Sequence, residues 1–362
     1  MRVLMINTVP MECNGITNVV CNIIENIDKK DLIIDCVAIN SPDSEYRNLI
    51  NKNGGEIFVI PNRLSKPHIY VIRLANLIRQ NNYDAIHAHG NSHTLALEML
   101  AAKIAGCSFR IAHSHNTTCK YKVVHKIMTP LFELLCTDRI ACGIEAGKWL
   151  FGKKEFWVLN NGIDTEKFRF NAKDRKRIRN KYGICDEVFV IGHVGNLNAQ
   201  KNQTFLIDIV KELKQIKKCK CLLVGEGEKK FEIETKVSEL GLAEDVIFVG
   251  ATQEVSAYLS AMDMIVMPSL YEGLPLSLIE EQACGLPCVV SDNITREVDL
   301  TGDLIFCSIN DTSLQWAKII NGISRNTDRC LRSDQAISLI IKKRYSITGE
   351  SMKLLKYYER LI

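Results

Sequence analysis

The sequence lacks the features that would place it across a membrane or outside the cell. No stretch of about 18 uncharged apolar residues occurs, so we expect no membrane-spanning helix. The first residues form a short apolar segment that runs directly into Asn7 and Thr8, without the longer apolar core and small-residue cleavage site of a signal peptide. The sequence therefore predicts a cytoplasmic protein.

The Cys-x-x-Cys spacing is also absent. The chain has 14 cysteines but no Cys-x-x-Cys pair, and they are scattered through apparent strands and helices, as at Cys21, Cys142 and Cys288. We expect them to be reduced and to behave mostly as small buried hydrophobic residues.

The small net charge and the absence of two glycine-rich motifs exclude some classes of ligand. The net charge of +4 is slight, which argues against nucleic-acid binding but is compatible with anionic ligands or an anionic membrane surface. Neither Gly-x-Gly-x-x-Gly nor Gly-x4-Gly-Lys-Ser/Thr occurs, so a nicotinamide cofactor or a P-loop nucleotide site has little support.

The chain of 362 residues does contain a regular alternation of short apolar runs and helix-length segments. Such alternation predicts parallel sheets covered by helices on both faces, which is the α/β class. The apolar runs are residues 3–6, 33–39, 57–60, 85–87, 110–113, 139–141 and 157–159, and then 188–193, 221–224, 246–248, 264–267, 288–291 and 304–307.

A change in composition divides these runs into two sets. Residues 160–168 have turn chemistry and residues 173–181 are highly charged, which is typical of a linker followed by a surface helix. We predict two Rossmann-like, doubly wound domains at 1–165 and 166–345, and a last helix at about 346–362. Ligands of such sheets bind beyond the carboxyl ends of the strands, so two domains facing each other would close a cleft. Met352, Leu355, Tyr358 and Leu361 should share the buried face of the last helix.

The most informative stretch is residues 268–287, between two apolar runs. Pro275 suits the first position of a helix and Gly285 suits the residue just past its end. Glu272 then lies in the loop at the carboxyl end of a strand, and Glu280 lies one to two turns into the helix. The helix N-terminus suits a phosphate or the polar edge of a sugar, and the two carboxylates can accept hydrogen bonds from sugar hydroxyls. The alternative is that Glu272, Glu280 and Glu281 are solvated surface residues.

The same stretch resembles the donor-site signature of retaining glycosyltransferases of the GT-B fold, family 4. The resemblance rests on Glu272-Gly-Leu-Pro275, on seven residues between Glu272 and Glu280, and on Ala283-Cys-Gly-Leu-Pro287. It implies two Rossmann-like domains facing a cleft, the first binding the acceptor and the second a nucleotide-sugar donor, with the last helix packing back on the first domain. It also implies no cofactor and no metal ion. It also implies that Glu272 contacts the donor sugar, that Glu280 holds the ribose, and that the donor site includes Gly273, Leu274, Pro275 and Leu276.

Two more loops of the second domain match the family. Gly195-Asn-Leu-Asn-Ala-Gln-Lys-Asn202 resembles a segment whose arginine and lysine grip the donor diphosphate. Lys201 matches the lysine, but Asn196 stands in the arginine position and offers only a neutral hydrogen bond. By resemblance, the turn formed by Gly225, Glu226 and Gly227 borders the nucleobase.

The first domain offers a glycine and two histidine pairs. Gly15 matches the family loop near the donor diphosphate and the acceptor, where a glycine lets the backbone approach a ligand. His87 with His89, and His113 with His115, lie at strand ends, where side chains two apart share a face. Metal binding is one interpretation, but no nearby cysteine or carboxylate cluster supports a closed zinc site. We predict hydrogen-bonding roles for His87 and His113. By resemblance, His115 reaches the donor sugar and phosphate.

Together these matches predict a retaining glycosyltransferase with His115, Lys201 and Glu272 as catalytic residues. The donor is expected to be a UDP-sugar, and the acceptor a lipid-diphosphate-linked saccharide used for capsule or exopolysaccharide synthesis. Basic and apolar residues at 63–79 and 120–126 could form a patch for anionic lipid at the inner membrane face, or could be solvated helix faces. Two alternatives stay open: a UDP-sugar epimerase of the same fold, and a non-catalytic nucleotide-sugar-binding subunit of another transferase, which Asn196 favours.

Overall fold

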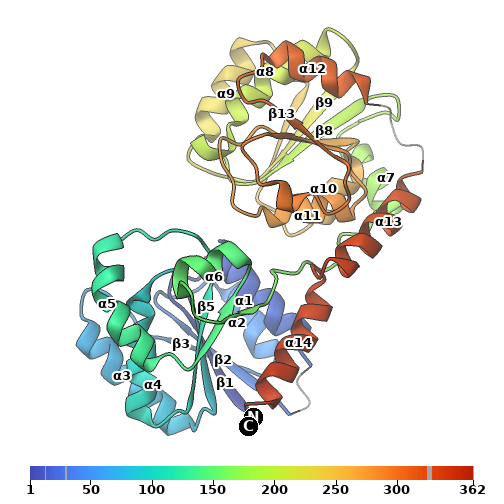
Figure 1. The fold of residues 1–362 in the computed structure, drawn as a ribbon. Helices are drawn as coiled ribbons and strands as arrows, with labels where there is room; N and C mark the ends of the chain where they lie inside the picture. Colours follow the sequence, from blue (N-terminus) through green and yellow to red (C-terminus); the bar gives the residue numbers. More distant parts are fainter. Residues whose placement is uncertain (13, 29–30, 324–327, 362) are drawn as a thin grey trace. The chain divides into compact units, whose positions relative to one another are not determined.

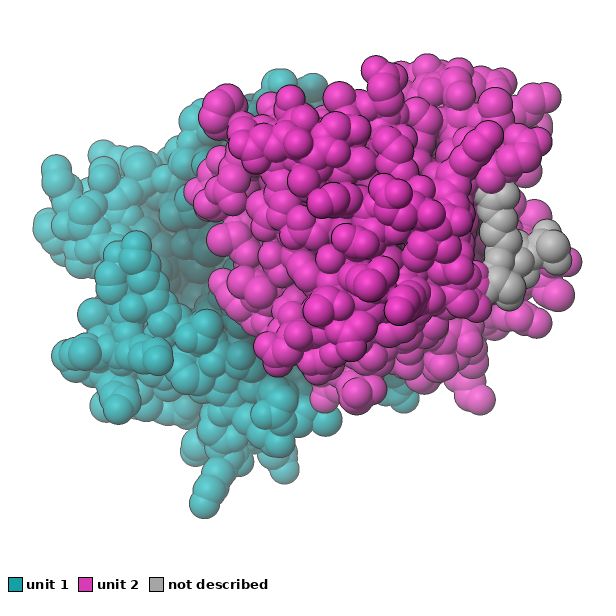
Figure 2. Space-filling model, turned by 90° about the horizontal axis from the view of Figure 1, so that it is seen from above, with its two compact units in different colours: residues 1–162, 344–362 teal, residues 163–343 magenta. Residues whose placement is uncertain are grey.

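The computed structural model describes residues 1–12, 14–28, 31–323 and 328–361. The chain divides into two compact units, which Figure 2 shows in separate colours. Unit 1 contains Met1–Gly162 together with Arg344–Ile362, and unit 2 contains Ile163–Lys343. The corresponding predicted boundaries are residues 165 and 345.

Unit 1 is built on a seven-stranded parallel sheet with the strand order β3-β2-β1-β4-β5-β6-β7 (Figure 1). Its strands are β1 (Arg2–Asn7), β2 (Ile33–Ala38), β3 (Ile57–Val59), β4 (Ala85–Gly90), β5 (Phe109–Ser114), β6 (Asp138–Ala141) and β7 (Trp157–Val158). Its α-helices are α1 (Gly15–Asn26), α2 (Ser44–Lys52), α3 (Pro67–Asn81), α4 (Ala96–Ala105), α5 (Lys122–Leu135), α6 (Ile144–Phe151) and α14 (Ile347–Glu359).

Alternation along the strands of unit 1 assigns their side chains to two faces. Leu4, Ile86 and Ala112 belong to the apolar core that includes Leu74 of α3 and Phe132 of α5. The intervening residues of the same strands point to the opposite face, because side chains alternate along a strand. That second face lies against α1 and α14, which pack on each other.

The last helix, α14, belongs to unit 1 although the chain reaches it only after unit 2. Of the predicted buried face, Tyr358 is confirmed as completely buried and Met352 is wrong, because it is 54% exposed. The buried positions of the helix are Ile347, Glu350, Ser351, Leu354 and Tyr358. Of the polar residues on this face, Glu350 has a hydrogen-bond partner from a distant segment, whereas the Ser351 hydroxyl has none among the described residues. The Glu350 carboxylate accepts a hydrogen bond from the backbone N–H of Asn160 at 3.0 Å.

Unit 2 contains a six-stranded parallel sheet with the strand order β10-β9-β8-β11-β12-β13. This is the 3-2-1-4-5-6 order of a Rossmann domain, with its topological switch point between β8 and β11. The strands are β8 (Phe189–Val194), β9 (Cys219–Val224), β10 (Val246–Gly250), β11 (Met264–Met267), β12 (Cys288–Ser291) and β13 (Leu304–Cys307). The α-helices are α7 (Ala172–Lys181), α8 (Gln203–Lys214), α9 (Lys230–Glu239), α10 (Val255–Ala261), α11 (Leu276–Ala283), α12 (Ser313–Gly322) and α13 (Arg329–Lys342).

The helix predicted between residues 268 and 287 is α11. Pro275 is the N-cap residue and not the first helical residue, because its ψ of 110° is extended. Gly285 lies just past the end with a φ of +68°, as its position in the sequence predicts. Glu272 therefore lies in the loop after β11, and Glu280 lies in the second turn of α11.

Candidate functional site

The loops after β8 and β11 meet at the switch point of unit 2. Lys201, after β8, forms an ion pair with Glu272, after β11, with 2.7 Å between Nζ and Oε1. The two side chains are only 14% and 9% exposed. Gln200 donates a hydrogen bond from Nε2 to the other carboxylate oxygen of Glu272 at 3.2 Å. The structure thus brings together two of the three predicted catalytic residues.

The N-terminus of α11 follows directly on this ion pair. Pro275 has no side-chain group to bond the first backbone N–H groups of the helix, and no side-chain cap is formed. Gly273 is exposed and has no atom within 4 Å of the position that a Cβ would occupy. Leu274 and Leu276 are partly buried beside it. An uncapped helix N-terminus with open space in front of it can accept an anionic group.

Two glutamates of α11 lie in unusual surroundings. Burial raises the pKa of Glu280 to about 7, although the nearby charge of Lys167 opposes this shift. Glu281 is completely buried, and neither carboxylate oxygen has a hydrogen-bond partner within the described part of the chain. Burial raises the pKa of Glu281 well above its usual range. The interpretation of Glu281 as a solvated residue is therefore wrong; its spacing of three from the buried Leu278 is the signal that places it on the inner face.

A buried chain of hydrogen bonds holds the loop that carries Asn196. His193 contacts the carbonyl oxygen of Val266 through Nδ1 at 3.0 Å, and its Nε2 lies 3.2 Å from Nε2 of Gln203. Gln203 also donates to the carbonyl oxygen of Asn196 at 2.9 Å. Burial lowers the pKa of His193 to about 4, so the ring is neutral at pH 7 and can accept from Gln203. The side chain of Asn196 itself is exposed.

The glycines of the turn after β9 serve close backbone packing. A Cβ on Gly225 would lie 2.1 Å from the carbonyl oxygen of Gly195, and one on Gly227 would lie 2.3 Å from that of Leu197. Glu226, between them, is exposed and forms an ion pair with Lys230 at 3.0 Å. The turn thus supports the loop that carries Asn196, and its place beside a nucleobase stays a prediction.

Unit 1 has its own cavity at the carboxyl ends of its central strands. This open cavity has a volume of about 490 Å³ and is lined by residues that follow β1, β4 and β5, among them Thr8, Ser92 and Asn116. The backbone N–H of His115 donates to Oδ1 of Asn91, another lining residue, at 3.0 Å. Gly15 begins α1, and no described atom lies within 4 Å of a Cβ built there, so no neighbouring group of the chain requires a glycine.

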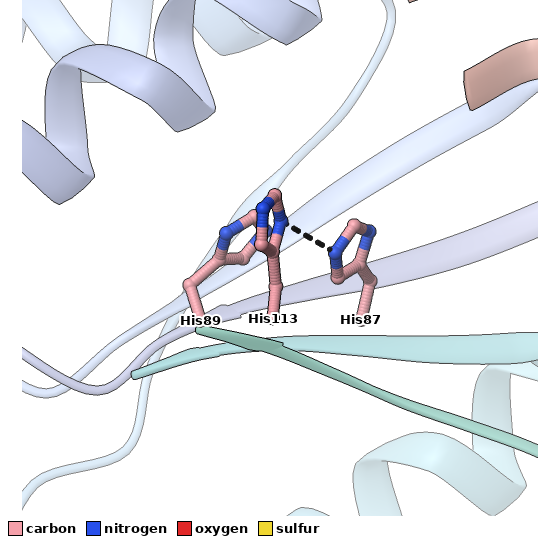
Figure 3. A group of neighbouring side chains, drawn as sticks. All are labelled: His87, His89 and His113. Carbon is pink, nitrogen blue, oxygen red and sulfur yellow. Dashed lines mark hydrogen bonds between the residues drawn. The ribbon is translucent and has the colours of Figure 1, made fainter. Parts of the chain in front are cut away.

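The two histidine pairs of unit 1 form one cluster. β4 extends to Gly90, three residues further than predicted, and pairs His89 with His113 in register. Figure 3 shows His87, His89 and His113 side by side, with His87 bonded to His113. His115 contacts His89, with 2.9 Å between Nε2 and Nδ1. Burial lowers the pKa of His115 to about 3, so its ring is neutral at pH 7.

The outer face of unit 1 exposes apolar residues among basic ones. On α5, Val123, Ile127 and Leu134 are each at least 70% exposed. Lys122 and Lys126 are exposed on the same helix. Arg63 does not belong to this patch, because it is buried and pairs with Glu98 at 2.8 Å. Among the described residues, no helix is both long and apolar enough to cross a membrane.

Comparisons with known proteins agree with this geometry. The model of the glycosyl transferases group 1 matches residues 174–330, and a model described as glycosyl transferase 4-like matches residues 14–142. The chain is 33% identical over 325 residues to "Putative glycosyltransferase EpsF" of Bacillus subtilis (strain 168), covering 86% of this chain and 84% of that protein. It is 30% identical over 279 residues to "UDP-Gal:alpha-D-GlcNAc-diphosphoundecaprenol alpha-1,3-galactosyltransferase" of Escherichia coli, covering 71% and 70%.

Solved structures show the same architecture. A crystal structure of Anabaena Alr3699/HepE in complex with UDP superposes with a TM-score of 0.80 at 19% identity, covering 99% of this chain and 100% of that one. The crystal structure of WaaG, described as a glycosyltransferase involved in lipopolysaccharide biosynthesis, gives a TM-score of 0.69 at 12% identity, covering 98% and 99%. At these identities the likeness concerns the fold, and the predicted pair of Rossmann-like domains is confirmed.

Proposed function

This chain belongs to the glycosyl transferase group 1 family and has the GT-B fold, and on that premise we propose that it moves a sugar from a UDP-sugar to a lipid-diphosphate-linked saccharide. The transfer retains the configuration of the anomeric carbon and serves exopolysaccharide or capsule synthesis. The name of the Escherichia coli relative specifies a UDP-linked donor and a diphosphoundecaprenol acceptor. A structural neighbour is described in complex with UDP-glucose. Both support a donor and an acceptor of these chemical classes.

The observation that carries the proposal is the ion pair of Lys201 and Glu272 at the switch point of unit 2. Nucleotides bind at this position in Rossmann sheets. Lys201 and the uncapped N-terminus of α11 hold the diphosphate, while Glu272 and Glu280 accept hydrogen bonds from the hydroxyls of the sugar and the ribose. Asn196 contributes a neutral hydrogen bond, so most of the positive charge that faces the diphosphate comes from Lys201.

The reaction exchanges one bond at the anomeric carbon for another on the same face of the sugar. The bond from this carbon to the diphosphate oxygen breaks, and the acceptor oxygen forms the new bond. The acceptor proton passes to an oxygen of the departing diphosphate. No nucleophilic side chain is used; Lys201 and the backbone N–H groups of α11 stabilise the charge that develops on the leaving group.

In unit 1, the cavity lined by Thr8, Ser92 and Asn116 holds the acceptor saccharide. His115 contacts the donor sugar. Its buried Nδ1 has no hydrogen-bond partner among the described residues, and a ligand oxygen that reaches it would supply one.

The patch on α5 places the protein against the membrane that carries a lipid-linked acceptor. Val123, Ile127 and Leu134 enter the interface, while Lys122 and Lys126 attract anionic headgroups, each adding about 1 kcal/mol. A mixture of exposed lysines and large aliphatic side chains suits an anionic bilayer, because both parts of a lipid find a partner.

Calorimetry tests the donor site first. UDP, GDP, ADP and then UDP-sugars are titrated into the wild type and into Lys201→Ala and Glu280→Ala, with the exposed Lys211→Ala as a control of equal charge change. The proposal predicts that UDP binds, that both site variants weaken it and that the control does not. If no nucleotide binds, the donor site is refuted and a non-catalytic role as a partner subunit, which Asn196 favours, takes its place.

A further inference from the structure

A group of three histidines lies on β4 and β5 of unit 1, outside the residues that line the cavity, and the family resemblance assigns it no role. His87 and His89 lie two residues apart on β4, and His113 lies opposite His89 on β5, so all three rings stand on one face of the sheet (Figure 3). The three residues are completely buried. One ring nitrogen from each lies within 4.8 Å of the others.

The hydrogen bonds of these rings are incomplete in a specific way. His87 contacts the hydroxyl of Tyr358 through Nδ1 at 2.5 Å, and His89 contacts His115 through Nδ1 at 2.9 Å. Nε2 of His89 and Nε2 of His113 are buried without a hydrogen-bond partner among the described residues. A buried imidazole nitrogen left without a partner is costly, which points to a missing ligand.

We propose that His87, His89 and His113 bind a zinc-class transition-metal ion through Nε2 of His87, Nδ1 of His113 and Nε2 of His89. The first two atoms are already 3.1 Å apart. Two imidazole nitrogens on a tetrahedral zinc ion, each at 2.0–2.1 Å, are about 3.3 Å apart. The pair therefore needs little movement, whereas His89, which stacks on His87 with ring planes 17° apart, must tilt toward the other two rings while its Nδ1 stays on Nε2 of His115.

The remaining ring nitrogens fit the second shell of such a site. Metal-bound histidines donate their other N–H to a nearby acceptor. His87 would donate to the Tyr358 oxygen, and His89 would donate to Nε2 of His115. Nε2 of His113 would donate into a small cavity of about 10 Å³ that His113 lines together with Asn160 and Glu350, which is room for about one water molecule.

Binding would have a structural consequence for His115. With the metal on Nε2 of His89, the only proton of that ring is on Nδ1, so Nε2 of His115 must accept it. The proton of a neutral His115 is then on Nδ1, the atom that has no partner in the protein. The ion would thus tie β4 to β5 and fix one tautomer of His115. This inference does not depend on the proposed glycosyl transfer.

Metal content and cobalt spectroscopy test the site without any activity assay. Untagged protein is purified from cells grown with Zn²⁺ or with Co²⁺, dialysed against a weak chelator and analysed by mass spectrometry and visible absorption. The same measurements are made on His89→Gln and His113→Gln, with the exposed His68→Gln as control. Tyr358→Phe keeps all three ligands and removes one second-shell partner, so it covers the case in which the ligand variants do not fold.

The site predicts about one ion per chain in the wild type and in His68→Gln, the ligand-field absorption of a low-symmetry Co²⁺ centre, and loss of both in the two ligand variants. Tyr358→Phe should bind the ion about 10- to 100-fold more weakly. Substoichiometric metal in the wild type overturns the proposal. Equal metal in folded ligand variants also overturns it, and assigns the ion to surface residues such as the exposed Cys185 and Cys330.

Discussion

Lys201 and Glu272 are each other's charged partner, with 2.7 Å between Nζ and Oε1. In the proposed donor site Lys201 also faces the diphosphate, so the carboxylate of Glu272 and the ligand compete for one ammonium group. The ammonium has three N–H donors and can serve both. Glu272 therefore reduces the positive charge that a phosphate meets while it orients Lys201 toward the switch point.

This competition predicts opposite effects of two substitutions on UDP binding. Lys201→Ala should weaken UDP binding by about 10- to 100-fold, because a hydrogen bond to a charged group is worth roughly 1.5–3 kcal/mol. Glu272→Gln should leave the affinity for UDP unchanged or raise it a few-fold, yet reduce the turnover of a UDP-sugar. Calorimetry measures the affinity, and the release of UDP measures the turnover. Parallel loss of UDP affinity in both variants would show that the pair acts only as a structural unit.

Asn196→Arg should raise the affinity for UDP by about tenfold, since a charged bidentate donor would replace a neutral one. Asn196 is exposed, so the longer side chain has room. Asn180→Arg introduces the same change at an exposed position of α7 and should have no effect. An unchanged affinity in Asn196→Arg would contradict the placement of this loop beside the phosphates.

Glu280 gives donor binding a dependence on pH. With a pKa of about 7, its carboxyl is mostly protonated at pH 6 and mostly ionised at pH 8. If the ionised form accepts the ribose hydroxyls, the affinity for UDP-glucose should rise by about tenfold between these values. UDP-glucose is preferred to UDP because a terminal phosphate titrates near pH 6. Glu280→Gln should bind UDP-glucose more weakly than the wild type at pH 8, and its affinity should not change with pH. If the affinity of this variant still rises steeply with pH, Glu280 is not the source of the dependence.

The same carboxyl predicts an opposite trend in stability. Its pKa is 4.5 in the unfolded chain and about 7 in the folded protein. Between these values the folded protein retains a proton that the unfolded chain has released. The contribution of Glu280 to the free energy of unfolding is therefore complete below pH 4.5 and falls as the pH rises toward 7. In denaturant unfolding, the difference between the free energies of unfolding of the wild type and of Glu280→Gln should show this fall with pH, because Glu281 and the buried histidines titrate in both proteins and cancel.

Tyr358→Phe should destabilise unit 1 by about 1–3 kcal/mol, because it leaves Nδ1 of the buried His87 without a partner. The melting temperature should fall by about 2–4 °C for each kcal/mol of destabilisation in a unit of this size. Tyr121→Phe removes a hydroxyl from an exposed side chain and serves as the control. Equal melting temperatures for all three proteins would show that Tyr358 does not anchor α14 through its hydroxyl.

Ile127→Glu should weaken binding to vesicles that contain an anionic lipid, because it puts a negative charge into the apolar part of the patch on α5. Phe231→Glu makes the matched change on α9 of unit 2, at a side chain that is 81% exposed. Cosedimentation with the vesicles should show weaker binding for Ile127→Glu alone. If the wild type does not bind anionic vesicles, or if both variants lose binding equally, the patch does not belong to the proposed function.

The sequence predicts the strands and the switch-point loops well because their signals are local. The apolar runs and turn residues locate every strand of both sheets to within a few residues, and the spacing of Glu272 and Glu280 places one in a loop and one in α11. The pairing of Lys201 with Glu272 involves residues 71 positions apart, across two neighbouring strands. No local pattern contains that contact, although the order of the strands implies it.

The histidines and α14 show where local patterns fail. Each pair predicts two rings on one face, but only the register of β4 on β5 puts His89 opposite His113 and creates a cluster. In α14, apolar spacing selects Met352, whereas the structure buries the polar Glu350 and Ser351. The buried Glu350 is paired with the backbone of Asn160, a contact between distant segments that apolar spacing within the helix does not contain.

The position of α14 also sets the order in which the protein can be completed on the ribosome. Residues 163–343 are synthesised between the sheet of unit 1 and the helix that covers it. At about 5–20 residues per second, adding these residues takes roughly 10 to 35 s. During that interval the sheet face that carries His87, His89 and His113 has no α14 over it, so newly made unit 1 keeps an open face that the mature protein closes with Tyr358.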